Sequence, residues 1–447
     1  MAGTHIWADT LDAAARRPGQ QGPDHQGPGQ QGPDHQGPGQ QGPDHQGPDH
    51  HPRTTPQAVR DSWRRARTAL LLHIALRLVG IGVVGVWGHR KGLGLHEVLA
   101  TRWDSVFYLN IAQHGYTSPM VPGCGLGGPT CKLAFFPLYP ALIRITSAVT
   151  GLPADRSAWL VALAASLLAA WGIFAVAEKL YDARVALFAV ALYAVVPHAL
   201  VQSMAYTEPV FTALAAWALY AVLCRAWLTA GALALLAGAT RPSGLAVIAA
   251  VVLSAAWQLL PAGGRRTPQL LPARGRRAPR RPTARLYGAM ALAPLGWAAF
   301  VVWVGHRMGS WDGYFVEQRQ WGSTFDGGVF TAQRLRDLFT LPTLTLDYVV
   351  AAATVVTAVI LLAVLALRRP PLVIWVYAAA LVLIAVGGAG FFHAKARFLL
   401  PAFPLLFPLA TAMARARRTT VWCTLTGAAL ASAFYSGYLT MVWTHSP

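Results

Sequence analysis

The chain has 447 residues, of which 54% are hydrophobic and only 12% are charged. Soluble domains carry about 25% charged residues, so this composition excludes an ordinary soluble protein. The formal net charge of +19 would suit a nucleic-acid-binding protein, but the arginines cluster at the ends of apolar runs, where membrane proteins place them. We therefore expect a membrane protein with no nucleic-acid partner.

The N-terminal part contains no long apolar run. Residues 19–48 repeat the unit GQQGPDHQGP three times. Glycine, proline and glutamine bury too little surface to offset the entropy of an ordered chain, so we expect residues 1–60 to form a disordered cytoplasmic tail. The histidines of the repeat leave metal binding as the alternative to a plain low-complexity tail.

Apolar segments begin at residue 68 and continue to the end of the chain. Most approach the length that a bilayer requires, and the arginine clusters fall between them on one side only. This asymmetry predicts about 11 transmembrane helices, over residues 68–88, 159–178, 185–203, 209–224, 227–239, 243–260, 286–305, 346–367, 372–390, 398–414 and 420–442. Segments 227–239 and 243–260 are short, which favours half-buried or broken helices around a cavity.

The loops between these segments fix the predicted orientation. Loop 261–285 contains eight arginines and is the strongest cytoplasmic marker. The N-terminus is then cytoplasmic, and two long loops, about 89–158 and 306–345, lie outside. We predict an all-α, polytopic membrane protein whose residues 61–447 form one transmembrane domain. Cys124 and Cys131 share the first outer loop, where oxidation is permitted, so we predict a disulfide between them.

Unusual polar residues gather at the predicted outer ends of the helices. Asp104 follows Arg102 and Trp103 and precedes Tyr108. A carboxylate that aromatic rings partly shield from water is more basic, which suits a general base acting on a sugar hydroxyl. The alternative is an interfacial aromatic belt in which Asp104 pairs with Arg102. Sequence spacing leaves both interpretations open.

A second group consists of one acid and several cations. Glu208 begins a predicted helix, so it is either a further catalytic carboxylate or a residue that complements the helix dipole. Cations on the outer side run against the orientation bias and would suit an anionic phosphate, with snorkelling to lipid phosphates as the alternative. These cationic candidates are Arg241, His393, Lys395 and Arg397.

Nucleotide-binding and hydrolase motifs are missing in a usable context, since we find no Walker loop, HExxH or GxSxG. A sugar donor would therefore have to arrive already activated. For a site outside the cytoplasm, a lipid-linked phosphosugar meets that need.

The polar blocks together resemble a known family. RWDSVFYLNIAQHGY, followed by LAFFPLYPALIR over Leu133–Arg144, resembles the PIG-V-like mannosyltransferases, which are related to GPI mannosyltransferase II. The segments AYTEPVF, TRPSG and HAKARFLLPAFPL look like the family's remaining blocks in the same order. The resemblance covers about residues 100–410, and the repeat tail has no counterpart.

This resemblance implies a GT-C glycosyltransferase fold and an inverting transfer of mannose from a polyprenyl-phosphate donor. It implies that Asp104 acts on the acceptor, with Glu208 as the next outer carboxylate. Residues expected to bind the substrate or the donor phosphate are Arg102, Trp103, Tyr108, Arg241, His393, Lys395 and Arg397. The motif has one aspartate rather than an acidic pair, which does not support a bound metal, and no cofactor is expected.

The high alanine, glycine and arginine content suggests a GC-rich bacterial source, and hence a bacterial plasma membrane with an extracytoplasmic site. Such a bacterium would not build GPI anchors, so the acceptor is expected to be another lipid or glycan. The alternatives are a transporter or flippase of a lipid-linked or polar substrate, and a catalytically silent relative that binds polyprenyl phosphate. The chain shows no repeated halves, which weighs against a transporter.

Overall fold

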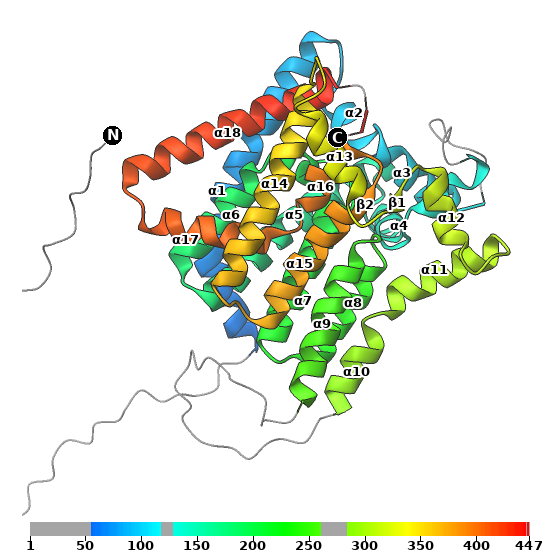
Figure 1. The fold of residues 1–447 in the computed structure, drawn as a ribbon, viewed down its shortest axis with the longest axis horizontal. Helices are drawn as coiled ribbons and strands as arrows, with labels where there is room; N and C mark the ends of the chain where they lie inside the picture. Colours follow the sequence, from blue (N-terminus) through cyan, green and yellow to red (C-terminus); the bar gives the residue numbers. More distant parts are fainter. Residues whose placement is uncertain (1–54, 118–127, 261–283, 444, 447) are drawn as a thin grey trace, which may run out of the picture. The chain divides into compact units, whose positions relative to one another are not determined.

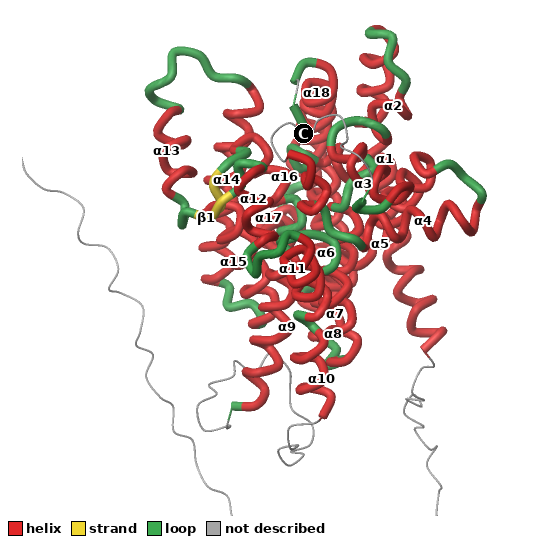
Figure 2. Tube along the Cα trace, turned by 90° about the vertical axis from the view of Figure 1, so that its right-hand side faces the viewer, coloured by secondary structure: helices red, strands yellow, loops and turns green. Residues whose placement is uncertain are grey.

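The structure is a computed structural model that describes residues 55–117, 128–260, 284–443 and 445–446. Residues Thr54–Pro447 form one compact unit, and most of its described part is helical, with a single pair of two-residue strands (Figures 1 and 2). The predicted all-α class is therefore confirmed. Helix α1 begins at Thr55, so it includes the last six residues that were assigned to the tail; residues 1–54 lie outside the described part.

The described elements follow one another in this order. The first elements are α1 Thr55–Arg90, α2 Leu95–Ala100, α3 Asp104–His114, the 3₁₀ helix η1 Gly128–Ala134 and α4 Leu138–Thr150. The next are α5 Ala154–Leu180, α6 Ala183–Val195, η2 Ala199–Ser203, α7 Glu208–Leu223, α8 Trp227–Gly238 and α9 Gly244–Leu259. Then come α10 Ala284–Leu292, α11 Leu295–Arg307, α12 Gly313–Gln320, β1 Thr324–Phe325, α13 Val329–Asp337, α14 Leu346–Leu367, α15 Leu372–Gly387 and β2 Gly388–Ala389. The last are η4 Phe392–Ala394, α16 Lys395–Leu399, η5 Phe403–Leu406, α17 Phe407–Arg415 and α18 Arg418–Met441.

Four helical stretches in the described residues are long and apolar enough to cross a membrane: Ser62–Arg90, Ala154–Leu180, Ala284–Arg307 and Leu346–Leu367. A fifth crossing results if the bent pair Phe392–Leu399 and Phe403–Arg415 counts as one span. Five shorter apolar helices are α6, α7, α8, α9 and α15. These lengths and compositions support an integral membrane protein but do not confirm the predicted count of eleven spans.

Two of the predicted segments are not continuous helices, and prolines explain both. The segment 185–203 is helical only to Val195, because Pro197 disfavours helical geometry at Val196, which is extended. The segment 398–414 is not one helix. Its chain bends by 77° between α16 and α17. Pro401 and Pro404 fall at this bend, and prolines cannot donate the amide hydrogen bonds of a continuous helix.

Helices α8, α10 and α11 approach each other unusually closely, at glycines. A Cβ atom on Gly231 would lie 2.8 Å from the Cα of Ala289 in α10. A Cβ on Gly296, at the start of α11, would collide with the carbonyl oxygen of Leu235 in α8. Backbone cannot move aside as a flexible side chain can, so glycine is required at these crossings.

We expect Gly296→Ala to destabilise the fold by about 1–3 kcal/mol, because the added methyl group overpacks the contact between α8 and α11. Thermal unfolding of the purified protein in detergent measures the effect. Gly427→Ala in α18 is the matched control, since a Cβ there meets nothing within 4 Å. Equal melting temperatures for the two variants would contradict the close approach.

Two contacts hold the segments that carry the polar residues. Arg77 of α1 donates hydrogen bonds to the carbonyl of Ala194, at the end of α6, and to the hydroxyl of Ser203, over 3.0 and 3.2 Å. These bonds fix the corner that leads into α7. Strands β1 and β2 pair in antiparallel fashion, with Thr324 opposite Ala389, and this joins the α12–α13 connection to the loop before η4.

Candidate active site

Asp104 is placed at the first turn of α3 by a constrained backbone. The preceding residue, Trp103, has a φ of 55°, which is unfavourable for a bulky side chain and is typical of functional sites. Asp104 therefore begins its helix at the positive end of the helix dipole. Its side chain is 23% exposed, so solvent or a substrate can reach the carboxylate.

The partner of Asp104 is Arg397, from the distant helix α16. Arg397 Nη1 donates a hydrogen bond to Asp104 Oδ2 over 2.8 Å. The predicted alternative, in which Asp104 pairs with Arg102, is wrong. The Arg102 guanidinium lies instead over the ring of Trp103, 4.8 Å from its centroid. Asp104 pairs with a residue far along the chain rather than with one nearby in sequence, because the fold brings α16 to the start of α3.

Glu208, the first residue of α7, completes an alternating row of charges. Its Oε1 atom lies 3.0 Å from Arg241 Nη1 and 3.4 Å from Arg397 Nε. Arg397 thus bridges the two carboxylates. The Glu208 side chain is only 3% exposed, and its ion pairs give it a role beyond complementing the helix dipole. Buried charges require such compensation, so the four side chains stabilise one another.

Aromatic rings hold the two guanidinium groups. The ring of Phe398 lies 5.9 Å from Arg241 Cζ and 5.3 Å from Arg397 Cζ. Tyr206 offers a second ring to Arg397, at 5.4 Å. Planar guanidinium groups stack well on such faces. The arginines are therefore fixed in direction as well as in position.

A cavity of about 230 Å³ adjoins one end of this row. Arg241 and Lys395 both line it, together with Gln318, Thr324 of β1 and Phe398. Lys395 Nζ donates to the carbonyls of Ala385 and Gly388, each over 2.6 Å. An ammonium group has three donors, so this pair of bonds aims the lysine and leaves one donor for another acceptor.

The remaining predicted residues lie around the row without joining it. Tyr108 is buried, and its hydroxyl is 3.3 Å from that of Thr207. Burial raises the pKa of Tyr108 above its usual value, so the phenol stays protonated. The His393 ring lies beside those of Trp443 and His445, with centroids 5.4 and 6.0 Å away. The predicted partner of Cys131, Cys124, lies outside the described residues, so their disulfide stays a prediction.

Two site residues were not predicted. Tyr206 stacks on Arg397, and burial together with the charge of Asp104 raises the pKa of its phenol well above the usual value. Tyr206 lies in AYTEPVF, one of the segments that resemble the family, but only Glu208 of that segment was predicted as a site residue. Ser446 donates a hydrogen bond to Asp104 Oδ1 over 3.0 Å. Nothing in its sequence surroundings indicates that contact.

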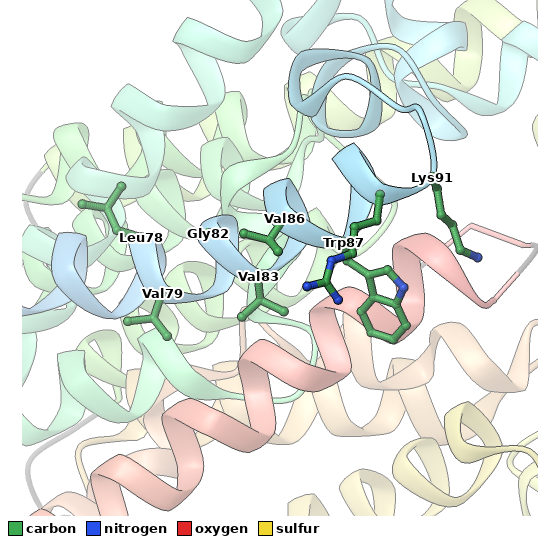
Figure 3. Close-up of a pocket in the computed structure, with 8 residues that line it drawn as sticks. Leu78, Val79, Gly82, Val83, Val86, Trp87 and Lys91 are labelled. Atoms are coloured by element: carbon green, nitrogen blue, oxygen red, sulfur yellow. The ribbon is translucent and has the colours of Figure 1, made fainter.

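A larger groove elsewhere lacks this chemistry. It has a volume of about 710 Å³ and runs along one face of α1, beside α18 (Figure 3). Its lining residues are Leu78, Val79, Gly82, Val83, Val86, Trp87, Arg90 and Lys91. None of them carries a carboxylate that could act as a general base. The charged row beside the smaller cavity is therefore the candidate active site.

One family model matches part of the chain. Residues 134–267 match the family model of dolichyl-phosphate-mannose-protein mannosyltransferases. No curated protein matches the chain. The matched segment contains Glu208 and Arg241, whereas Asp104, Lys395 and Arg397 lie outside it.

Solved structures of one archaeal enzyme are also similar. The oligosaccharyltransferase of Archaeoglobus fulgidus, tethered with an acceptor peptide, has 13% identity and a TM-score of 0.45, over 86% of this chain and 56% of that one. The same organism's AglB, in complex with an inhibitory peptide and a dolichol-phosphate, has 13% identity and a TM-score of 0.42, over 86% and 57%. The chain thus spans just over half the length of these proteins. The family-model match and the apolar helices together support a membrane glycosyltransferase of the GT-C superfamily.

Proposed function

We propose that this protein transfers a mannosyl group from a polyprenyl-phosphate donor to the hydroxyl of an extracytoplasmic lipid or glycan acceptor. The observation that carries the proposal is the row Asp104–Arg397–Glu208–Arg241 beside a cavity that Lys395 also lines. The match to a family named for dolichyl-phosphate-mannose supports the donor. The resemblance to PIG-V-like enzymes supports mannose.

Asp104 suits the general base better than Glu208 does. The Asp104 side chain is 23% exposed, while that of Glu208 is 3% exposed and lies between two arginines. An acceptor hydroxyl can reach the first carboxylate but not the second. We assign Glu208 the task of holding Arg241 and Arg397 in place.

The reaction is a single displacement. The acceptor oxygen forms a bond to the anomeric carbon, the bond from that carbon to the phosphate oxygen breaks, and its electron pair leaves with the phosphate. The acceptor proton moves to Asp104. Cations close to the departing oxygen stabilise the charge that develops there, and Arg241 and Lys395 at the cavity are the candidates.

The charges of the site change in step with those of the donor. Arg241 and Arg397 balance the carboxylates of Glu208 and Asp104, and Lys395 at the cavity, which also interacts with Asp326, faces the single negative charge of the phosphodiester. Transfer turns the phosphodiester into a monoester with a charge of about −1.5 to −2. Protonation of Asp104 removes one negative charge from the site at the same moment. The site's positive charge therefore rises as the leaving group becomes more negative.

A direct assay tests the proposal. Membranes from a strain that expresses the protein are supplied with labelled polyprenyl-phosphate mannose, and the products are analysed by mass spectrometry. We expect a mannosylated lipid or glycan that is absent from membranes without the protein. Donor that crosses the bilayer unchanged would instead indicate a flippase, and donor that binds without reacting would indicate a silent relative.

Orientation gives a separate prediction. The arginines of loop 261–285 predict that this loop is cytoplasmic and that Asp104 faces outside. We expect a cysteine placed in the loop to resist membrane-impermeant thiol reagents in intact cells and to react after permeabilisation. A cysteine at Thr340, in loop 306–345, is the control and should react in both cases, because Thr340 is exposed. The reverse pattern would place the active site in the cytoplasm.

A further inference from the structure

The hydroxyl of Ser446 lies against the carboxylate of Asp104, the candidate base, in a polar position that we call the seat. It donates to Asp104 Oδ1 over 3.0 Å and accepts from Arg397 Nη1 over 3.1 Å. The Tyr206 hydroxyl lies 3.1 Å away as a third partner. A general base must receive a hydrogen bond from the hydroxyl that it deprotonates, and Ser446 makes that bond here.

We propose that the seat of the Ser446 hydroxyl is the acceptor-hydroxyl subsite, and that the segment carrying Ser446 must leave before an external alcohol reacts. The inference rests on the proposed function, since it takes Asp104 as the base. Ser446 thus competes with the acceptor.

The contacts of the segment suit reversible occupation. Ring contacts attach it to the site: Trp443 and His445 lie against His393, with ring centroids 5.4 and 6.0 Å away. The Nε1 atom of Trp443 is buried without a hydrogen-bond partner among the described residues. Such an orphaned donor costs free energy and makes the closed position less stable.

The anchor of the segment lies just before it. Lys91 Nζ donates to the carbonyl of Met441, the last residue of α18, over 2.6 Å. Val442, which follows, is half exposed. The backbone NH groups of Val442 and Trp443 both donate to the carbonyl of Tyr438 in α18. Opening of the segment breaks at most these two bonds, and residues 443–447 can be removed without loss of the Lys91 contact to Met441.

Thiol labelling tests the occupation independently of turnover. Ser446→Cys should react with N-ethylmaleimide about tenfold more slowly than Thr419→Cys, an exposed position at the far end of α18, because labelling requires the segment to open. Adding Asp104→Asn or Arg397→Lys to Ser446→Cys should accelerate its labelling. Equally fast labelling of the thiols introduced at the two positions would overturn the proposal.

Turnover tests the competition. With polyprenyl-phosphate mannose as donor and methanol as the probe alcohol, deletion of residues 443–447 should raise methyl mannoside formation several-fold, chiefly through a lower KM for methanol. Ser446→Ala should have a smaller effect and Thr419→Ala none. Slower transfer after the deletion would overturn the competition. If the thiol of Ser446→Cys is protected but neither the full chain nor the deletion variant consumes donor, the proposed function fails while the occupation of the seat stands.

Discussion

Asp104→Asn is expected to lower turnover by a factor of about 10² to 10⁴, the usual contribution of acid–base catalysis. Asparagine keeps the size and polarity of the side chain, and its amide oxygen can still accept from Arg397. It cannot take up the acceptor proton. Protein level and donor binding should therefore survive, while the chemical step fails.

The measurement is the steady-state transfer of mannose from labelled donor, with donor binding measured separately. Asp104→Glu should recover little, because a carboxylate displaced by about 1 Å is poorly aimed. Asp337→Asn is the control, since Asp337 pairs with Arg334 at the surface. Near-normal turnover of Asp104→Asn would remove Asp104 from the reaction and make Glu208→Gln the next variant to examine.

Arg397→Lys is expected to lower kcat by a factor of about 10² with a much smaller change in KM for the donor. Arg397 reaches Asp104 through Nη1 and Glu208 through Nε, and one ammonium group cannot reproduce that fork. We regard Arg397 as a positioning residue, because it acts through Asp104. The lysine variant keeps the positive charge, so its loss of kcat measures the lost hydrogen-bonding geometry rather than a lost charge.

Two controls make this result specific. Arg319→Lys changes an exposed pair with Asp312 and should leave kcat unaltered. Arg397→Ala should lose more activity than the lysine variant, and added guanidinium should restore part of it by filling the vacated space. Damage to the fold alone would not respond to guanidinium. A lysine variant with full kcat would show that the bridge between the two carboxylates is dispensable.

Much of the fold followed from local features of the sequence. The long apolar run 346–367 is α14 to the residue, because length and hydropathy alone define such a helix. Proline effects were harder to place. Pro197, Pro401 and Pro404 lie within apolar stretches, and hydropathy does not register the amide hydrogens that they lack.

The sequence indicated the members of the charged row but not which of them pair. Asp104, Glu208, Arg241 and Arg397 were all identified, because charges near apolar helices require a reason. Which of these residues pair with one another depends on which helix ends meet in the fold, and the hydrophobic periodicity of the sequence does not contain that information. Arg102, two residues before Asp104, was the obvious partner in sequence, yet the tertiary fold supplied Arg397. Ser446 lay beyond prediction for the same reason.

The separation of Asp104 and Arg397 along the chain has a consequence for biosynthesis. These residues are 293 positions apart, so the ribosome has made most of the protein before Arg397 emerges. Glu208 can meet Arg241 much earlier, because α7, α8 and α9 are consecutive. Asp104 has to wait. A nascent or truncated chain therefore holds a carboxylate without its bridging arginine, and chains that stop before α16 should be both inactive and marked for degradation by the membrane's quality-control proteases.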